Sequence, residues 1–99
     1  MKVHARVKWI PHLSFNGLPI WRQIVCALED AIGSGELRSG DGLPSQRYIA
    51  DFIGVHVNTV NRAMRDAVTR GLIVAKTRRG MVVGFNEVLR ETARAGRNN

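Results

Sequence analysis

The chain has 99 residues, which is enough for one domain with a single modest core and too few for two. Its net charge of +7 favours a polyanionic partner, either nucleic acid or an anionic membrane surface. The single Cys26 excludes an internal disulfide and no apolar run is long enough to cross a bilayer, so we expect a cytoplasmic protein with no membrane partner.

The first predicted helix follows an N-terminal arm. Residues 1–17 are expected to form that arm, because they show only a weak alternation of basic and apolar side chains. Pro19 suits the first turn of a helix. From Ile20 the apolar residues recur at i, i+4, i+7 and i+8 as far as Gly33, which predicts a helix of about 14 residues.

The glycine-rich segment 33–42 predicts a connection, with Leu37 and Leu43 as apolar anchors beneath the domain. Its glycine spacing fits neither the P-loop nor the dinucleotide-binding fingerprint, and no strand precedes it. We therefore do not expect this segment to cradle a nucleotide phosphate.

Residues 45–71 predict two short helices joined by a corner. Ser45 is a good N-cap, and Gly54 stands where a helix ends in a left-handed residue. A second apolar stripe begins at Val60 and stops at Gly71. Two helices joined by a corner of about four residues are typical of a helix-turn-helix unit.

The polar face of the second helix in this unit has the composition that reading a DNA major groove requires. Asn and Arg side chains bind adenine and guanine edges with two hydrogen bonds each. Asn and Thr are mediocre helix formers, which a purely structural surface does not favour. The alternative interpretation is an ordinary solvated face. The candidates for base-edge contacts are Asn58, Thr59, Asn61 and Arg62.

The chain then changes from helical to extended periodicity. Residues 72–76 and 81–85 are β-prone, and the loop 77–80 ends in glycine, which predicts a hairpin. A hairpin directly after a helix-turn-helix, with Arg78 and Arg79 at its tip, forms a wing that reaches the DNA backbone or minor groove. The candidates for phosphate contacts are Ser45, Arg47, Arg65, Lys76, Arg78 and Arg79, together with His56, for which a solvent-exposed corner residue stays an alternative.

The predicted fold is mainly α with a small β-hairpin (α+β). It is a winged helix-turn-helix of three helices and a two-stranded wing over residues 18–85, followed by a tail or linker at 86–99. We expect no enzyme, because the sequence shows no paired catalytic carboxylates, nucleophile elbow or metal-ligand spacing.

Two alternative functions stay open. An RNA-binding domain would be expected to expose more aromatic residues for base stacking. A winged helix that only binds proteins would not require an Arg/Asn face and a basic wing together.

From about Leu18 to Gly84, the sequence resembles the DNA-binding domain of the GntR family of bacterial transcriptional regulators. The matching segments are Pro19-Ile20-Trp21-Arg22-Gln23-Ile24, Ser34-Gly35-Glu36-Leu37-Arg38-Ser39-Gly40-Asp41, Leu43-Pro44-Ser45-Gln46-Arg47, Ala50, Ile53-Gly54-Val55, Asn58-Thr59-Val60, Arg62-Ala63 and Gly71-Leu72-Ile73. Trp9-Ile10-Pro11 and Asn58-Thr59-Val60 are similar to the MocR subgroup, whose members continue into a pyridoxal-phosphate-binding domain. The resemblance implies that cofactor only for such a C-terminal domain, and none for this chain.

The resemblance implies a repressor or activator that binds a palindromic operator in double-stranded DNA as a homodimer. The DNA contacts that it implies are Arg47, Thr59, Arg62 and the wing-tip glycine Gly80. The chain departs from the family at His56-Val57, where Ser-Arg is usual, so a customary helix cap and a customary DNA-contacting arginine are missing. Asn61 replaces a frequent arginine, and Arg78 replaces a common wing glycine. These departures predict an operator other than the usual half-site, with affinity depending more on the wing.

Overall fold

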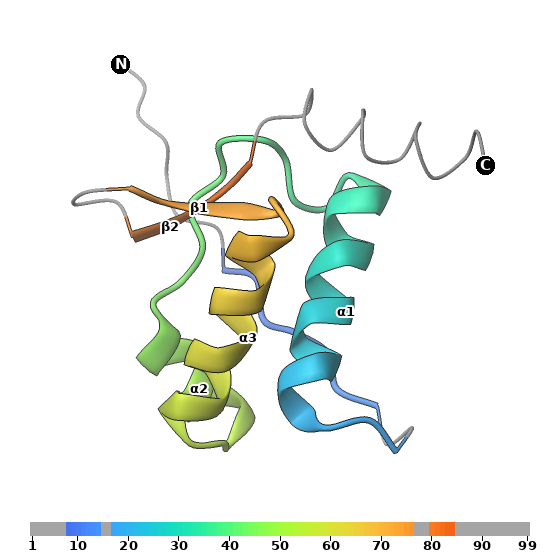
Figure 1. Cartoon of the computed structure of the whole chain (residues 1–99), viewed down its shortest axis with the longest axis vertical. Coiled ribbons are helices and arrows are strands. Elements are labelled where there is room, and N and C mark those ends of the chain that lie inside the picture. The colour runs from blue at the N-terminus through green and yellow to red at the C-terminus, as the bar shows by residue number, and fades with distance from the viewer. Residues whose placement is uncertain (1–7, 15–16, 77–79, 85–99) are drawn as a thin grey trace.

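The computed structural model describes residues 8–14, 17–76 and 80–84. Within these residues, three helices are followed by an antiparallel hairpin, which confirms the predicted fold class (Figure 1). The elements in chain order are α1 (Ile20–Ser34), α2 (Gln46–Ile53), α3 (Val57–Thr69), β1 (Ile73–Lys76) and β2 (Gly80–Val83). The tail predicted at 86–99 and the wing tip at 77–79 lie outside the described residues.

Local signals in the sequence set the helix ends. The Ser45 hydroxyl accepts a hydrogen bond from the Tyr48 backbone N–H and caps α2. Gly54 ends the same helix in the left-handed conformation, as predicted. α1 continues one residue beyond the predicted stop at Gly33, because Gly35, with φ +88°, takes the left-handed position instead.

The helix α3 lies at the centre of the fold and packs against α1, α2 and β1 (Figure 1). Both predicted anchors of the connection, Leu37 and Leu43, are buried in the core. The largest fully buried side chains are Ile24, Leu28, Leu37, Leu43, Ile49, Val60, Met64, Ile73 and Val83. The core therefore fixes the helix whose outward face carries the base-edge candidates.

The described part of the N-terminal arm packs onto α1. Trp9 is buried in the core, so this end of the predicted arm lies on the domain. The buried Gln23 side chain of α1 holds the chain that precedes the helix. Its Oε1 accepts a hydrogen bond from the Ser14 backbone N–H, and its Nε2 donates one to the Leu18 carbonyl. Within the described residues, no helix combines the length and the apolar composition needed to cross a bilayer.

The strand β2 of the wing is hydrogen-bonded along both of its edges. β1 and β2 pair in a register that joins Ile73 to Val83 and Lys76 to Gly80. The segment 40–43 pairs with the outer edge of β2: the Val83 N–H donates to the Asp41 carbonyl, and the N–H groups of Gly40 and Leu43 donate to the carbonyls of Val83 and Met81. An isolated two-stranded hairpin is marginal in water, so this third segment contributes to holding the wing in place.

Candidate nucleic-acid interface

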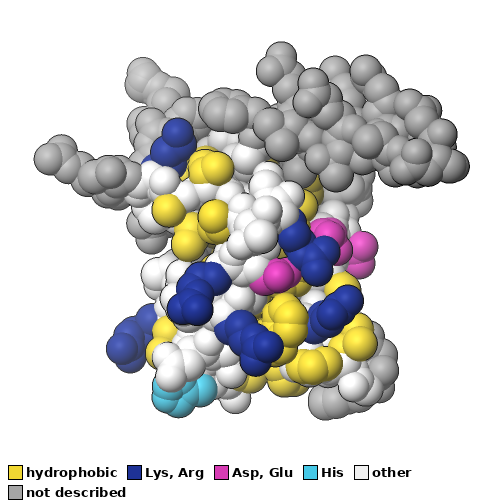
Figure 2. Space-filling view, in the orientation of Figure 1, with side chains coloured by type: hydrophobic (Ala, Val, Ile, Leu, Met, Phe, Trp, Pro, Cys, Tyr) yellow, Lys and Arg dark blue, Asp and Glu magenta, His cyan; other side chains and the backbone are white. Residues whose placement is uncertain are grey.

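The outward face of the central helix and its surroundings are basic. Figure 2 shows Lys and Arg side chains spread over the face that carries α2 and α3, with the acidic side chains gathered on the side of α1. The exposed cations on this face are Arg47 on α2, Arg62 and Arg65 on α3, and Lys76 at the end of β1. These four cations thus lie around the predicted reading helix.

The four base-edge candidates are not equivalent. Asn58 and Arg62 are exposed on α3, whereas Thr59 and Asn61 are half-buried. The Asn61 Nδ2 donates to the Gln46 Oε1 at 3.1 Å, which ties the middle of α3 to the first residue of α2. Part of the hydrogen-bonding capacity of Asn61 is therefore used within the protein. Gln46 was not among the predicted site residues.

The Arg62 guanidinium lies over the indole ring of Trp21, with Cζ 4.5 Å from the ring centroid. Trp21 is half-buried and packs against the core. This contact joins the first turn of α1 to the polar face of α3. The sequence analysis did not predict the stack.

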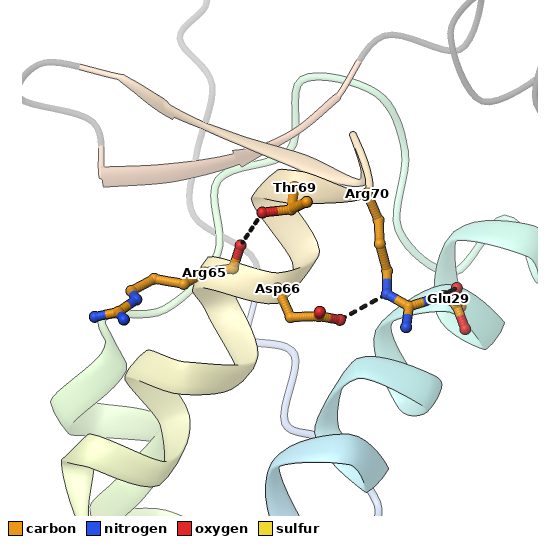
Figure 3. A network of polar contacts seen from close by, with 5 residues as sticks. All are labelled: Glu29, Arg65, Asp66, Thr69 and Arg70. Atoms are coloured by element: carbon orange, nitrogen blue, oxygen red, sulfur yellow. Dashed lines mark hydrogen bonds and ion pairs between the residues drawn. The ribbon is translucent and has the colours of Figure 1, made fainter.

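An ion-pair network joins one arginine to acidic side chains of α3 and α1. Arg70 Nε donates to Asp66 Oδ2 at 2.6 Å, and Arg70 Nη1 lies 3.5 Å from Glu29 Oε2 on α1. The hydrogen bond to Asp66 and its negative charge raise the pKa of Arg70 above its ordinary value, so Arg70 stays charged. Figure 3 shows Arg65 pointing to the opposite side of α3 from this network. Asp66 and Glu29 therefore share the Arg70 cation, and neither forms an ion pair with Arg65.

The start of α2 and the root of the wing enclose a common cleft. Its volume is about 250 Å³, and its polar lining includes Ser45, Gln46, Lys76 and Gly80. Gly80 takes a positive φ of 76° at the first position of β2, opposite Lys76. Of the wing candidates, Arg78 and Arg79 lie outside the described residues. The structure thus brings together the predicted phosphate contacts of α2 and of the wing root.

Residues 21–83 match the family described as bacterial regulatory proteins, gntR family. The chain belongs to the gntR family. The match extends from the second residue of α1 to the last residue of β2. It covers every element of the interface described above and confirms the resemblance found in the sequence.

Two curated relatives from Bacillus subtilis (strain 168) are similar to this chain. It is 30% identical over 80 residues to YdeF, an uncharacterized HTH-type transcriptional regulator, across 81% of this chain and 17% of YdeF. It is 32% identical over 71 residues to the HTH-type transcriptional repressor YtrA, across 72% of this chain and 55% of YtrA. Both relatives are transcription regulators, which confirms the expectation of a non-enzyme. The chain matches about a sixth of YdeF and about half of YtrA.

Two solved structures share the fold. YtrA from Sulfolobus acidocaldarius, a GntR-family transcription factor, has a TM-score of 0.71 at 33% identity, across 92% of this chain and all of that chain. AraR(DBD) in complex with operator ORX1 has a TM-score of 0.65 at 24% identity, across 84% of this chain and all of that chain. The likeness to AraR shows the winged-helix fold alone.

This member of the gntR family caps its third helix with an unusual residue. The sequence analysis expected a missing cap at His56, but the His56 Nδ1 accepts a hydrogen bond from the Asn58 backbone N–H at 3.0 Å. The expectation was wrong, because an imidazole nitrogen replaces the customary hydroxyl oxygen as acceptor. A neutral imidazole that accepts at Nδ1 carries its proton on Nε2. The exposed His56 therefore keeps one N–H donor at the start of α3.

Proposed function

We propose that this chain binds double-stranded DNA in a sequence-specific manner as the DNA-binding domain of a bacterial transcriptional regulator. The observation that carries the proposal is the exposed α3 face. Asn58 and Arg62 lie there beside Arg65, whose guanidinium makes no hydrogen bond or ion pair within the described residues. The winged-helix fold of AraR(DBD), which is solved with its operator, supports the same assignment.

In this proposal α3 enters the major groove and its exposed polar side chains contact base edges. Each well-formed two-pronged contact contributes about 1–3 kcal/mol of discrimination against a wrong base. Arg62 is suited to guanine, because its paired N–H donors match the O6 and N7 acceptors, and Asn58 is suited to adenine. The amide of Asn61 acts together with that of Gln46, since the two are already hydrogen-bonded.

The surrounding groups set the register of the domain on DNA. Phosphates are contacted by Ser45 and Arg47 at the start of α2, by Arg65 on α3 and by Lys76 at the end of β1. Arg78, Arg79 and His56 extend this set in the proposal. Phosphate contacts carry no direct sequence information, so the specificity resides in α3 and the affinity is shared with the wing.

The oligomeric state and the cellular location are also part of the proposal. Two copies of the chain bind a palindromic operator with half-sites about 34–36 Å apart, one helical turn of DNA. The protein acts in the cytoplasm. We assign pyridoxal phosphate to no residue of this chain, and it would belong to a MocR-type C-terminal domain.

In vitro selection from a pool of random DNA duplexes tests this function. The wild-type chain should enrich a defined motif, whereas Arg62→Ala should relax one base position of that motif. Arg47→Ala should weaken recovery of all sequences alike, because it contacts phosphate. Arg38→Ala, an exposed arginine in the connection between α1 and α2, is the matched control and should change neither. Recovery of no motif, or preferential capture of single-stranded RNA by the exposed Tyr48 and Phe52, would refute the proposal.

A further inference from the structure

Two arginines lie at the junction of α1 and α3, and they have opposite surroundings. Arg70 uses its N–H groups on Asp66 and Glu29, whose carboxylates neutralise it. Arg62 stacks on Trp21 and makes no hydrogen bond or ion pair within the part of the chain that the structure describes. Of these two arginines, only Arg70 donates hydrogen bonds within the described residues.

The Arg62 guanidinium carbon lies over the face of the Trp21 ring, 4.5 Å from the ring centroid. An aromatic ring attracts a cation through the negative potential over its face. The ring accepts no conventional hydrogen bond, and within the described residues no other group accepts one from the Arg62 guanidinium. The five N–H donors of arginine lie in one plane, so this held guanidinium is suited to bind two acceptors that lie side by side.

The indole ring under this cation is held in place by packing. Trp21 is half-buried, packs against the core and belongs to α1, which packs along α3. A free arginine side chain loses much rotamer freedom when it is fixed on a ligand. A side chain already stacked on a fixed ring has less freedom left to lose, so its bound form is favoured.

We propose that Trp21 is a positioning residue for DNA readout, which holds the Arg62 guanidinium edge-on toward a guanine in the major groove. This inference rests on the proposed function, because it requires α3 to enter that groove. It assigns to α1 a part in specificity, through a residue that itself touches no base. The paired acceptors N7 and O6 of guanine are the partner that the guanidinium edge fits.

A double-mutant cycle on the duplex motif recovered by selection tests the proposal. Trp21→Leu should weaken binding by about two- to fivefold, the range of an exposed cation–π contact. Trp21→Phe should lose less, because it keeps an aromatic face. In the Arg62→Ala background, Trp21→Leu should have no further effect. The preference for guanine at the Arg62 position should fall in Trp21→Leu, while the preferences at other positions stay unchanged.

Three results would overturn it. Equal losses with and without Arg62 would show that Trp21 only supports the fold. Unchanged binding by Trp21→Leu, or tighter binding, would show that Arg62 leaves the ring on DNA. If the wild-type chain recovers no motif, both the proposed function and this inference fail. If the wild-type chain recovers a motif but the double-mutant cycle shows no coupling between Trp21 and Arg62, only this inference fails. Val68→Ala, which truncates an exposed apolar residue of α3, is the control. Thermal unfolding of each variant checks folding, and Trp21→Phe keeps the test decisive if Trp21→Leu is unstable.

Discussion

The affinity of this chain for duplex DNA should fall by about 10³-fold when the monovalent salt concentration rises from about 50 to about 200 mM. The proposed phosphate contacts of one domain include five cations, which are Arg47, Arg65, Lys76, Arg78 and Arg79. Neutralising about five phosphates releases condensed counterions and gives a log–log slope of about −4.5 to −5. Fluorescence anisotropy with a labelled duplex, at a series of salt concentrations, measures the slope.

Single substitutions assign that slope to residues. Arg65→Gln should reduce it by about one, because one phosphate contact is lost. Arg38→Gln removes an equal charge from the connection between α1 and α2 and should leave the slope unchanged. If both variants reduced the slope alike, net charge rather than the α3 face would govern binding. A slope near zero for the wild-type chain would rule out phosphate contacts as the source of affinity.

Leu28→Ala should lower the free energy of unfolding by about 2–5 kcal/mol. Leu28 is fully buried on α1, the helix that packs along α3, and its truncation leaves a cavity at the centre of the core. The whole domain has only about 5–15 kcal/mol of stability, so the loss is a large fraction of the total. Urea unfolding followed by circular dichroism measures the change.

The matched control for Leu28→Ala is Val68→Ala. Val68 is 40% exposed on α3, so its truncation should change the free energy of unfolding by less than about 0.5 kcal/mol. The two variants share the type of change and differ in burial. Similar losses in both would contradict the placement of Leu28 in the core. A loss of DNA binding by Leu28→Ala should be recovered at lower denaturant or temperature, because the reading face itself is intact.

Local rules were sufficient for most of the fold. The helical period and the caps predicted three helices. As predicted, Ser45 caps the start of α2 and Gly54 ends it in the left-handed conformation. The sequence could not show which glycine ends α1, because Gly33 and Gly35 both follow the apolar stripe. The structure shows that Gly35 takes the left-handed conformation that ends the helix. The pairing of segment 40–43 with β2 joins residues far apart in the chain, which no local pattern encodes.

The same limit applies to the candidate site. Helical period predicted that Thr59, Asn61 and Arg62 face outward, and of these Arg62 is exposed whereas Thr59 and Asn61 are half-buried. It could not predict that Asn61 is tied to Gln46 on another helix, or that Arg62 lies over Trp21. Each of these contacts depends on how helices cross. The His56 cap was missed for another reason, since only a specific imidazole orientation makes Nδ1 an acceptor.

The central claim is that the outward face of α3, the start of α2 and the wing root form one DNA-contact surface. Nuclear magnetic resonance titration of the isotopically labelled chain with its selected duplex tests it most directly. We expect the largest amide shift changes at residues 46–47, 57–65 and 76, with little change at residues 9–14 in the arm behind α1. Changes concentrated on the arm and on the far side of α1, with the α3 amides unmoved, would contradict the account.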